Sequence, residues 1–224
     1  MKKVIFWDFD GTLVKSNQSF LQSLKRACLE NQVTIRPDLL RDFLSQSCSW
    51  YFPDRTYEDR TGEAWWQDLL SALDLFFSEN GVPGEKRPRI LAAFRGYAVS
   101  YPYELYGDAI AALRAANEAG YENYLLSNNF PELGDTVKKL GLSPYLKGIF
   151  LSSELGAEKP NPLIFRKALA LAGSPSRAIM VGDNPLADIE GGEAAGMLTV
   201  LVHREGQAQH VFSELSQISS LLSE

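Results

Sequence analysis

Five short apolar runs along the chain constrain its fold more than any other feature. They lie at residues 3–9, 121–127, 148–152, 178–182 and 198–203. Most are apolar on successive residues rather than on alternate ones, which is typical of strands covered on both faces, as in a parallel sheet. Apolar residues at helical spacing lie between the later runs, at 109–116, 133–140 and 165–172. This alternation of strand and helix predicts a doubly wound α/β domain with a parallel sheet.

One long stretch, residues 16–103, interrupts the alternation. It has no run typical of a buried strand, and instead carries four amphipathic stripes, at 20–28, 39–44, 66–77 and 90–98. We therefore expect a helical domain of residues 16–103, inserted into an α/β core domain formed by residues 1–15 and 104–224. A last amphipathic pattern, over residues 211–222, predicts a terminal helix.

Composition narrows the classes of partner. A net charge of -6 argues against a nucleic-acid or anionic-membrane partner, but it is compatible with a small phosphorylated molecule. Cys28 and Cys48 lack the spacing of a zinc site, and as buried small side chains they fit a reducing compartment. The first apolar run is too short for a signal peptide, and no later run reaches membrane length. We therefore expect a cytoplasmic protein.

Two carboxylates follow the first apolar run. Asp8 and Asp10 stand two positions apart, so on a strand they point into the same crevice. Gly11 allows a sharp turn after them, and Thr12 adds a hydroxyl. Two carboxylates this close need a cation or a proton between them. The pair could instead cap the turn that follows the strand, and these residues alone leave both readings open.

Polar residues also follow the next predicted strands. Ser127 and Asn128 offer donors for an anion, although such residues also make an ordinary helix N-cap. Pro160 restricts the backbone of Lys159, which fixes where its side chain begins. That ammonium could meet a phosphate or remain a solvated surface group.

The last acidic residues belong to the fourth predicted strand and its continuation. Asp183 ends the strand, where ligand sites of open α/β sheets lie, and Asp188 falls in the first turn of the next helix. Asp188 could simply balance the helix dipole. The four clusters all follow predicted strands and together supply carboxylates, an ammonium and neutral donors. That set suits Mg²⁺, which prefers oxygen ligands, and phosphoryl transfer.

In this order the motifs resemble those of a known family. The run of residues 8–12, then Ser127, then Lys159 with Pro160, and then 182–183 with Asp188 resemble the four ordered motifs of the haloacid dehalogenase superfamily. The resemblance covers roughly residues 1–15 and 104–205, and the helical insertion resembles the mobile cap of that superfamily. One departure is Lys15, because relatives often carry an acidic residue there.

The resemblance implies a reaction and its residues. It implies Mg²⁺-dependent hydrolysis of a phosphate monoester of a small metabolite. Asp8 would be the nucleophile that forms an aspartyl-phosphate, and Asp10 would be the general acid and base. The Asp8 carboxylate, the Asp10 backbone carbonyl and the Asp183 carboxylate would hold Mg²⁺.

The remaining roles follow from the same resemblance. Ser127 and Lys159 would bind the phosphoryl group, with Asn128 helping through its backbone N–H. Asp188 would orient Lys159 or a magnesium-bound water. Arg55, in an aromatic segment at 50–57, is a candidate substrate contact, although those aromatics could simply pack the cap. We expect His203, in the last predicted strand, and His210, in the terminal helix, to lie away from the motifs.

Three alternatives stay in view. A sugar-phosphate mutase of the same superfamily keeps both aspartates. Haloacid dehalogenases generally lack the second aspartate and magnesium, so Asp10 favours phosphate chemistry. A non-catalytic binding protein would be marked by the loss of Asp8 or of a magnesium carboxylate, and both are present.

Overall fold

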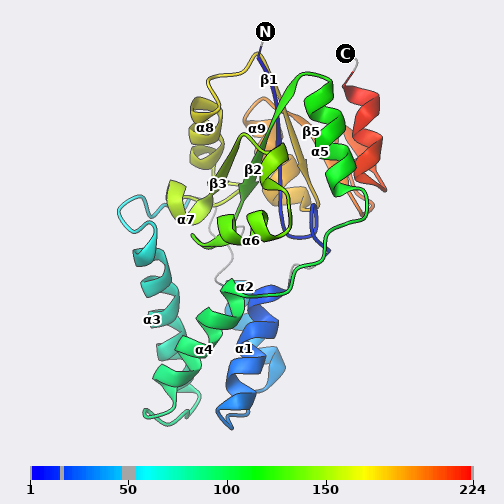
Figure 1. Ribbon diagram of the computed structural model, residues 1–224. Coiled ribbons are helices and arrows are strands. Elements are labelled where there is room, and N and C mark those ends of the chain that lie inside the picture. The colour runs from blue at the N-terminus through cyan, green and yellow to red at the C-terminus, as the bar shows by residue number, and fades with distance from the viewer. Residues whose placement is uncertain (1, 16–17, 47–53, 223–224) are drawn as a thin grey trace.

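The computed structural model describes residues 2–15, 18–46 and 54–222, and its centre is a six-stranded parallel sheet (Figure 1). The strand order is β3-β2-β1-β4-β5-β6. The strands are β1 (Lys3–Trp7), β2 (Tyr121–Ser127), β3 (Gly148–Leu151), β4 (Arg177–Gly182), β5 (Leu198–Val202) and β6 (His210–Phe212). Because the order reverses at β1, the switch point at which ligands bind in such sheets lies there. The predicted doubly wound parallel sheet is confirmed.

Helices cover both faces of the sheet, and alternate residues of β1 bury into each. Ile5 and Trp7 belong to the apolar cluster on one face, whereas Val4 and Phe6 belong to the cluster on the other. The covering helices are α5 (Ala109–Glu118), α6 (Leu133–Lys139), α7 (Ser152–Leu155), α8 (Pro162–Leu171) and α9 (Gly191–Ala194). Three further helical segments complete the part of the chain around the sheet. They are the 3₁₀ helices η2 (Ser143–Tyr145) and η4 (Leu215–Leu221) and the π-helix η3 (Pro185–Glu190). Burial on both faces explains why the strands are apolar on successive residues.

Of the helices described between β1 and β2, the first four lie together below the sheet in Figure 1, whereas α5 packs on the sheet. These four are α1 (Ser19–Glu30), α2 (Pro37–Gln46), α3 (Glu63–Glu79) and α4 (Arg87–Val99). Their stripes bury Leu24, Trp66 and Phe94 in the same apolar cluster that covers one face of the sheet. The helical insertion is therefore present, and its status as a separate domain of residues 16–103 stays a prediction.

The two connections to the inserted helices run side by side. Val14 forms an antiparallel bridge with Leu105, and the N–H of Lys15 donates to the carbonyl of Glu104 at 2.9 Å. The ammonium of Lys15 also pairs with the Glu104 carboxylate. Lys15, the departure from the family pattern, thus joins the outgoing and returning chains.

The predicted terminal helix over 211–222 is wrong in its first part. Val211 lies in β6 and is 44% exposed, and the helical turn begins only at Leu215. A strand of three residues is too short to show its own period, and Val211 happens to lie four residues before Leu215, at helical spacing.

Two smaller expectations concern the cysteines and the membrane. Cys28 is buried, as predicted, and Cys48 lies outside the described residues. In the described ranges, the helices are too short or too polar to cross a bilayer.

Candidate active site

The loop after β1 brings the first two carboxylates to the loop after β4. The N–H of Asp8 donates to the carbonyl of Val181 at 2.9 Å, which extends the pairing of β1 with β4. Gly11 then turns the chain with φ +79°, and a Cβ at this position would lie 2.5 Å from Oδ2 of Asp183. Only glycine allows this approach, and Asp8, Asp10 and Asp183 therefore meet at the switch point.

Lys159 is the cation at the centre of the site. Its Nζ lies 2.8 Å from Oδ1 of Asp8 and 2.5 Å from Oδ1 of Asp188. Burial alone would lower the pKa of Lys159, but the charges of Asp188 and Asp8 outweigh burial and raise it. The ammonium, only 2% exposed, therefore stays protonated between two carboxylates.

Asn128 and Asp188 both hydrogen-bond to Lys159. The Asn128 side chain clamps the Lys159 backbone, donating to its carbonyl at 2.8 Å and accepting from its N–H at 2.7 Å. Asp188 is fully buried, and its second oxygen accepts the N–H of Asn184 at 3.0 Å. Asp188 thus contacts the Lys159 ammonium, and its orienting role stays a prediction. For Asn128 the structure adds a side-chain contact, while the predicted contact of its N–H with phosphate stays a prediction.

Three carboxylates form a cluster that fits a divalent cation. Asp8, Asp183 and Asp188 each place an oxygen within 4.8 Å of the others. Burial and the charge of Asp8 raise the pKa of Asp183 to about 6. A bound cation relieves the repulsion between the Asp8 and Asp183 carboxylates, and carboxylate oxygens are the ligands that Mg²⁺ prefers. Both oxygens of Asp188 accept hydrogen bonds, from Lys159 and from the N–H of Asn184, whereas Asp8 meets Lys159 through Oδ1, so Asp8 and Asp183 are the better placed pair.

Asp10 is held by a residue that the sequence did not single out. Nδ2 of Asn129 lies 2.6 Å from Oδ2 of Asp10. Burial, followed by the charge of Asp8, raises the pKa of Asp10 well above its usual value. Asn129 stands in the same polar run as Ser127 and Asn128, but an asparagine after a strand gives no sign of which side chain it will meet.

Two further predicted site residues are Ser127 and Arg55. Ser127 is the last residue of β2 and is 1% exposed. Arg55 is exposed, and its carbonyl accepts from Nδ2 of Asn161 at 3.2 Å, two residues after Lys159. Both roles stay predictions, and residues 50–53 of the aromatic segment lie outside the described part of the chain.

The expectation that His203 lies away from the motifs is wrong. Its Nε2 lies 3.1 Å from the Thr12 carbonyl oxygen, and its ring stacks on Tyr106 at 3.6 Å between centroids. The error arose because the end of β5 lies at the same sheet edge as the loop after β1. His210 begins β6 rather than lying in a terminal helix.

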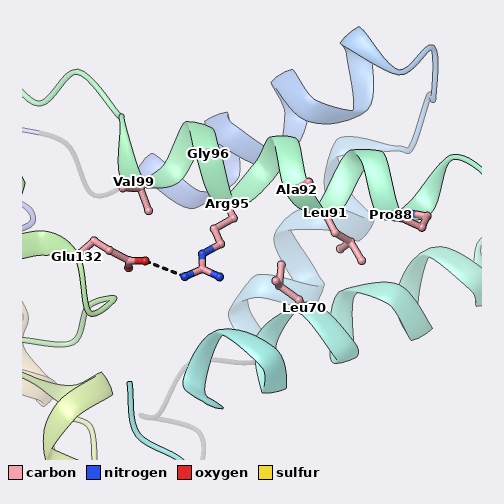
Figure 2. A pocket seen from close by; sticks show the side chains of 8 residues that line it. All are labelled: Leu70, Pro88, Leu91, Ala92, Arg95, Gly96, Val99 and Glu132. Atoms are coloured by element: carbon pink, nitrogen blue, oxygen red, sulfur yellow. Dashed lines mark hydrogen bonds and ion pairs between the residues drawn. The ribbon is translucent and has the colours of Figure 1, made fainter. Parts of the chain in front are cut away.

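The inserted helices contact the sheet part through a polar cluster (Figure 2). Glu132, just before α6, accepts from Nη2 of Arg95 at 2.9 Å and from Nε1 of Trp66 at 2.8 Å. A hollow of about 650 Å³ opens beside them, lined by Leu70, Pro88, Leu91, Ala92, Arg95, Gly96, Val99 and Glu132. These lining residues do not include any of the candidate catalytic residues.

The fold and this site define an α/β enzyme with an acidic centre at the switch point of a parallel sheet. The chain belongs to the haloacid dehalogenase-like hydrolase family, whose model matches residues 2–196. The predicted family and the expectation of a hydrolase are thereby confirmed.

Similar proteins agree with this assignment. The chain is 37% identical over 128 residues to a phosphoserine phosphatase of Thermus thermophilus, a match that covers 56% of this chain and 51% of that protein. The chain thus spans about half the length of this relative. It is 29% identical to a glyceraldehyde 3-phosphate phosphatase of Pyrococcus furiosus, with 98% and 92% covered. Relatives named as phosphatases support the expected phosphoric monoester hydrolase.

A solved structure shares the whole fold. The HAD-hydrolase YfnB of Bacillus subtilis, determined with bound magnesium, superposes with a TM-score of 0.76 at 17% identity, covering 100% of this chain and 99% of that one. At this identity the likeness concerns the fold.

Proposed function

We propose that the chain hydrolyses a phosphate monoester of a small metabolite in the presence of Mg²⁺, through an aspartyl-phosphate on Asp8. The observation that carries the proposal is the buried Asp8–Lys159 pair, 2.8 Å apart, beside Asp10, whose Oδ1 is buried. Asp8 supplies an oxygen nucleophile, Lys159 supplies a positive charge for the phosphoryl oxygens, and Asp10 supplies a proton.

The side chains divide the steps of the proposed reaction between them. A carboxylate oxygen of Asp8 bonds to phosphorus while the bond to the leaving oxygen breaks. Asp10 protonates that leaving oxygen and later takes a proton from the water that displaces Asp8. Lys159, held by Asp188, neutralises the phosphoryl oxygens, and Ser127 and the backbone N–H of Asn128 donate to them.

The acidic cluster supports a metal. The carboxylates of Asp8 and Asp183 and the backbone carbonyl of Asp10 would hold Mg²⁺. When bound, the ion neutralises charge on the phosphoryl group. The raised pKa of Asp183 supports this assignment, because a cation removes the repulsion that raises it.

A small phosphorylated metabolite is the proposed substrate class. The relatives named as phosphoserine and glyceraldehyde 3-phosphate phosphatases support it. We propose that residues 16–103 act as a cap over the site and set the leaving group, with Arg55 as a candidate contact. The mutase alternative keeps the same first step and differs in whether water or a second sugar hydroxyl accepts the phosphoryl group.

Phosphate release from p-nitrophenyl phosphate and from a panel of phosphorylated metabolites tests the proposal. The panel contains phosphoserine, glyceraldehyde 3-phosphate and several sugar phosphates, each assayed with and without Mg²⁺. We expect release that requires Mg²⁺ and stops on addition of EDTA. An isomeric sugar phosphate formed without free phosphate would favour the mutase. No release from any compound would refute the hydrolase.

A further inference from the structure

Asn129 determines how Asp10 presents its carboxyl group. Nδ2 of Asn129 donates to Oδ2 of Asp10 at 2.6 Å, across 119 positions of sequence. Oδ1 of Asp10 is buried and has no hydrogen-bond partner among the residues that the structure describes. The two oxygens are therefore unequal: one is bound to Asn129, and the other is left for a ligand.

The amide of Asn129 has one possible orientation. Its own Oδ1 accepts the N–H of Phe130 at 3.0 Å, and an amide nitrogen in that place could not accept. The backbone N–H of Asn129 donates to Oγ of Ser152 at 3.1 Å, which holds the loop itself. Asn129 is 4% exposed and Ser152 is fully buried. The neighbouring backbone thus directs Nδ2, a donor, at Asp10.

We infer that Asn129 is a positioning residue, which orients Asp10 so that Oδ1 carries the proton to the leaving group. The inference rests on the proposed function. An oxygen that accepts the N–H of Asn129 at 2.6 Å is the one without a hydrogen, so a protonated Asp10 bears its hydrogen on Oδ1. As the Asp8–phosphorus bond forms and the bond to the leaving oxygen breaks, this hydrogen moves to the leaving oxygen. In the second step Oδ1 receives a proton from the water that bonds to phosphorus as the Asp8–phosphorus bond breaks.

The role predicts a dependence on the leaving group. p-Nitrophenolate departs as a stable anion and gains little from a proton, whereas phenolate gains much more. A positioned general acid contributes about 10²–10⁴-fold where it is needed. We therefore expect Asn129→Ala to lower kcat/KM for phenyl phosphate about 10-fold to 100-fold more than for p-nitrophenyl phosphate, since it loses part of that contribution.

The experiment measures kcat/KM for these two substrates on the full chain at one Mg²⁺ concentration. Asn129→Ala is compared with Asn129→Asp, which keeps the shape and the acceptor for Phe130 but loses the donor to Asp10. Asn123→Ala is the matched control, because Asn123 is a fully buried amide on β2, the strand that precedes Asn129, and it bonds Trp7 and Leu113 instead. We expect the control to lower stability and leave the ratio between the substrates unchanged.

A double mutant separates positioning from structure. If Asn129 acts through Asp10, Asn129→Ala adds little to the loss already caused by Asp10→Asn. Equal losses on both substrates, full loss on both, no loss on either, or additive losses in the double mutant would each overturn the inference. Should Asn129→Ala fail to fold, Asn129→Asp decides. Wild-type protein that releases no phosphate from either substrate would instead overturn the proposed function.

Discussion

Asp8 and Asp10 stand two residues apart, yet their surroundings assign them different chemistry. Asp8 accepts a hydrogen bond from the Lys159 ammonium at 2.8 Å. Asp10 meets only a neutral amide through Oδ2, and burial and the Asp8 charge raise its pKa well above the usual value. These different surroundings support the two proposed roles, attack by Asp8 and proton transfer by Asp10.

Asp8→Asn tests the first of these roles. The change keeps the shape of the side chain and removes its charge, so we expect turnover to fall by at least about 10⁴-fold, as for removal of other catalytic nucleophiles. The fold should persist, because Lys159 keeps its 2.5 Å contact with Asp188 and Asp183 loses a repulsive neighbour. Phosphate release and a thermal melt measure the two effects. Activity above a few per cent of wild type would contradict the role of Asp8.

The sequence predicts the position of residues that lie at the ends of neighbouring strands. It does not predict contacts that depend on how two loops pack. The places of Asp8 and Asp183 follow from the ends of parallel strands, which must meet, whereas α7 separates Lys159 from the end of β3. The contact of Asn129 with Asp10 depends on how two loops are packed, and the sequence contains no period or spacing that encodes it. His203 was missed for the same reason, because its partner is a backbone carbonyl at Thr12.

At the scale of elements, a backbone attachment joins the inserted helices to the core, besides the two chain connections and the contacts with Glu132. The segment 54–62, which precedes α3, lies against the start of α7 and the loop after it. The N–H of Tyr57 donates to the Gly156 carbonyl at 2.7 Å, and the N–H of Gly62 donates to the Ser153 carbonyl at 2.8 Å. Thr56 forms a β-bridge with Ala157. These backbone contacts hold the segment that carries Arg55 next to the Lys159 loop.

Gly156→Ala should disturb this attachment. Gly156 has φ +77°, and a Cβ there would lie 2.5 Å from Cα of Glu58 and 2.9 Å from its nitrogen, so backbone must move. We expect a loss of about 1–3 kcal/mol of stability, or roughly 2–12 °C in Tm for a chain of this size. Limited proteolysis should show faster cleavage within 54–62.

A helical glycine provides the control for that change. Gly96 lies in α4, where an added Cβ meets nothing within 4 Å, so Gly96→Ala should hold or raise Tm. Equal Tm and equal proteolysis for Gly156→Ala and wild type would show that segment 54–62 does not depend on this close approach.

Long strands and helices were predicted correctly from the sequence, whereas the shortest strand was not. The strand at 121–127 was predicted with its observed bounds, and the four inserted helices fall on their predicted stripes. The three residues of β6 were assigned to a helix because a strand so short shows no alternation of its own. The docking of segment 54–62 was not predictable, because backbone hydrogen bonds between distant segments leave no side-chain pattern.

The whole molecule joins its parts through charge as well as through apolar packing. One apolar cluster includes residues from the inserted helices and from the sheet, and the Arg95–Glu132 contact lies between them (Figure 2). The acidic cluster, by contrast, places like charges close together at the switch point, and apolar packing does not remove the repulsion between them. Proton or cation binding at this one place therefore affects the stability of the whole fold.

Mg²⁺ should raise Tm, and more so at pH 7.5 than at pH 5. The pKa of Asp183 is raised to about 6 from its usual 3.8, so the folded protein binds this proton more tightly than the unfolded chain. Its contribution to stability is therefore fully present below about pH 4 and is lost as the pH rises through 6. At pH 7.5 the Asp183 carboxylate is ionised and can bind the cation, whereas at pH 5 a proton competes for it.

The size of this effect follows from ligand linkage. At 100 times its dissociation constant, Mg²⁺ adds about 2.7 kcal/mol, which corresponds to roughly 5–10 °C in Tm for a chain of this length. Melts are compared at equal ionic strength with NaCl, since screening alone also weakens repulsion between carboxylates. Asp183→Asn should raise the metal-free Tm at pH 7.5, because it removes a repulsive charge, and should abolish most of the Mg²⁺ shift. An equal shift at both pH values, or one that persists in Asp183→Asn, would place the cation elsewhere.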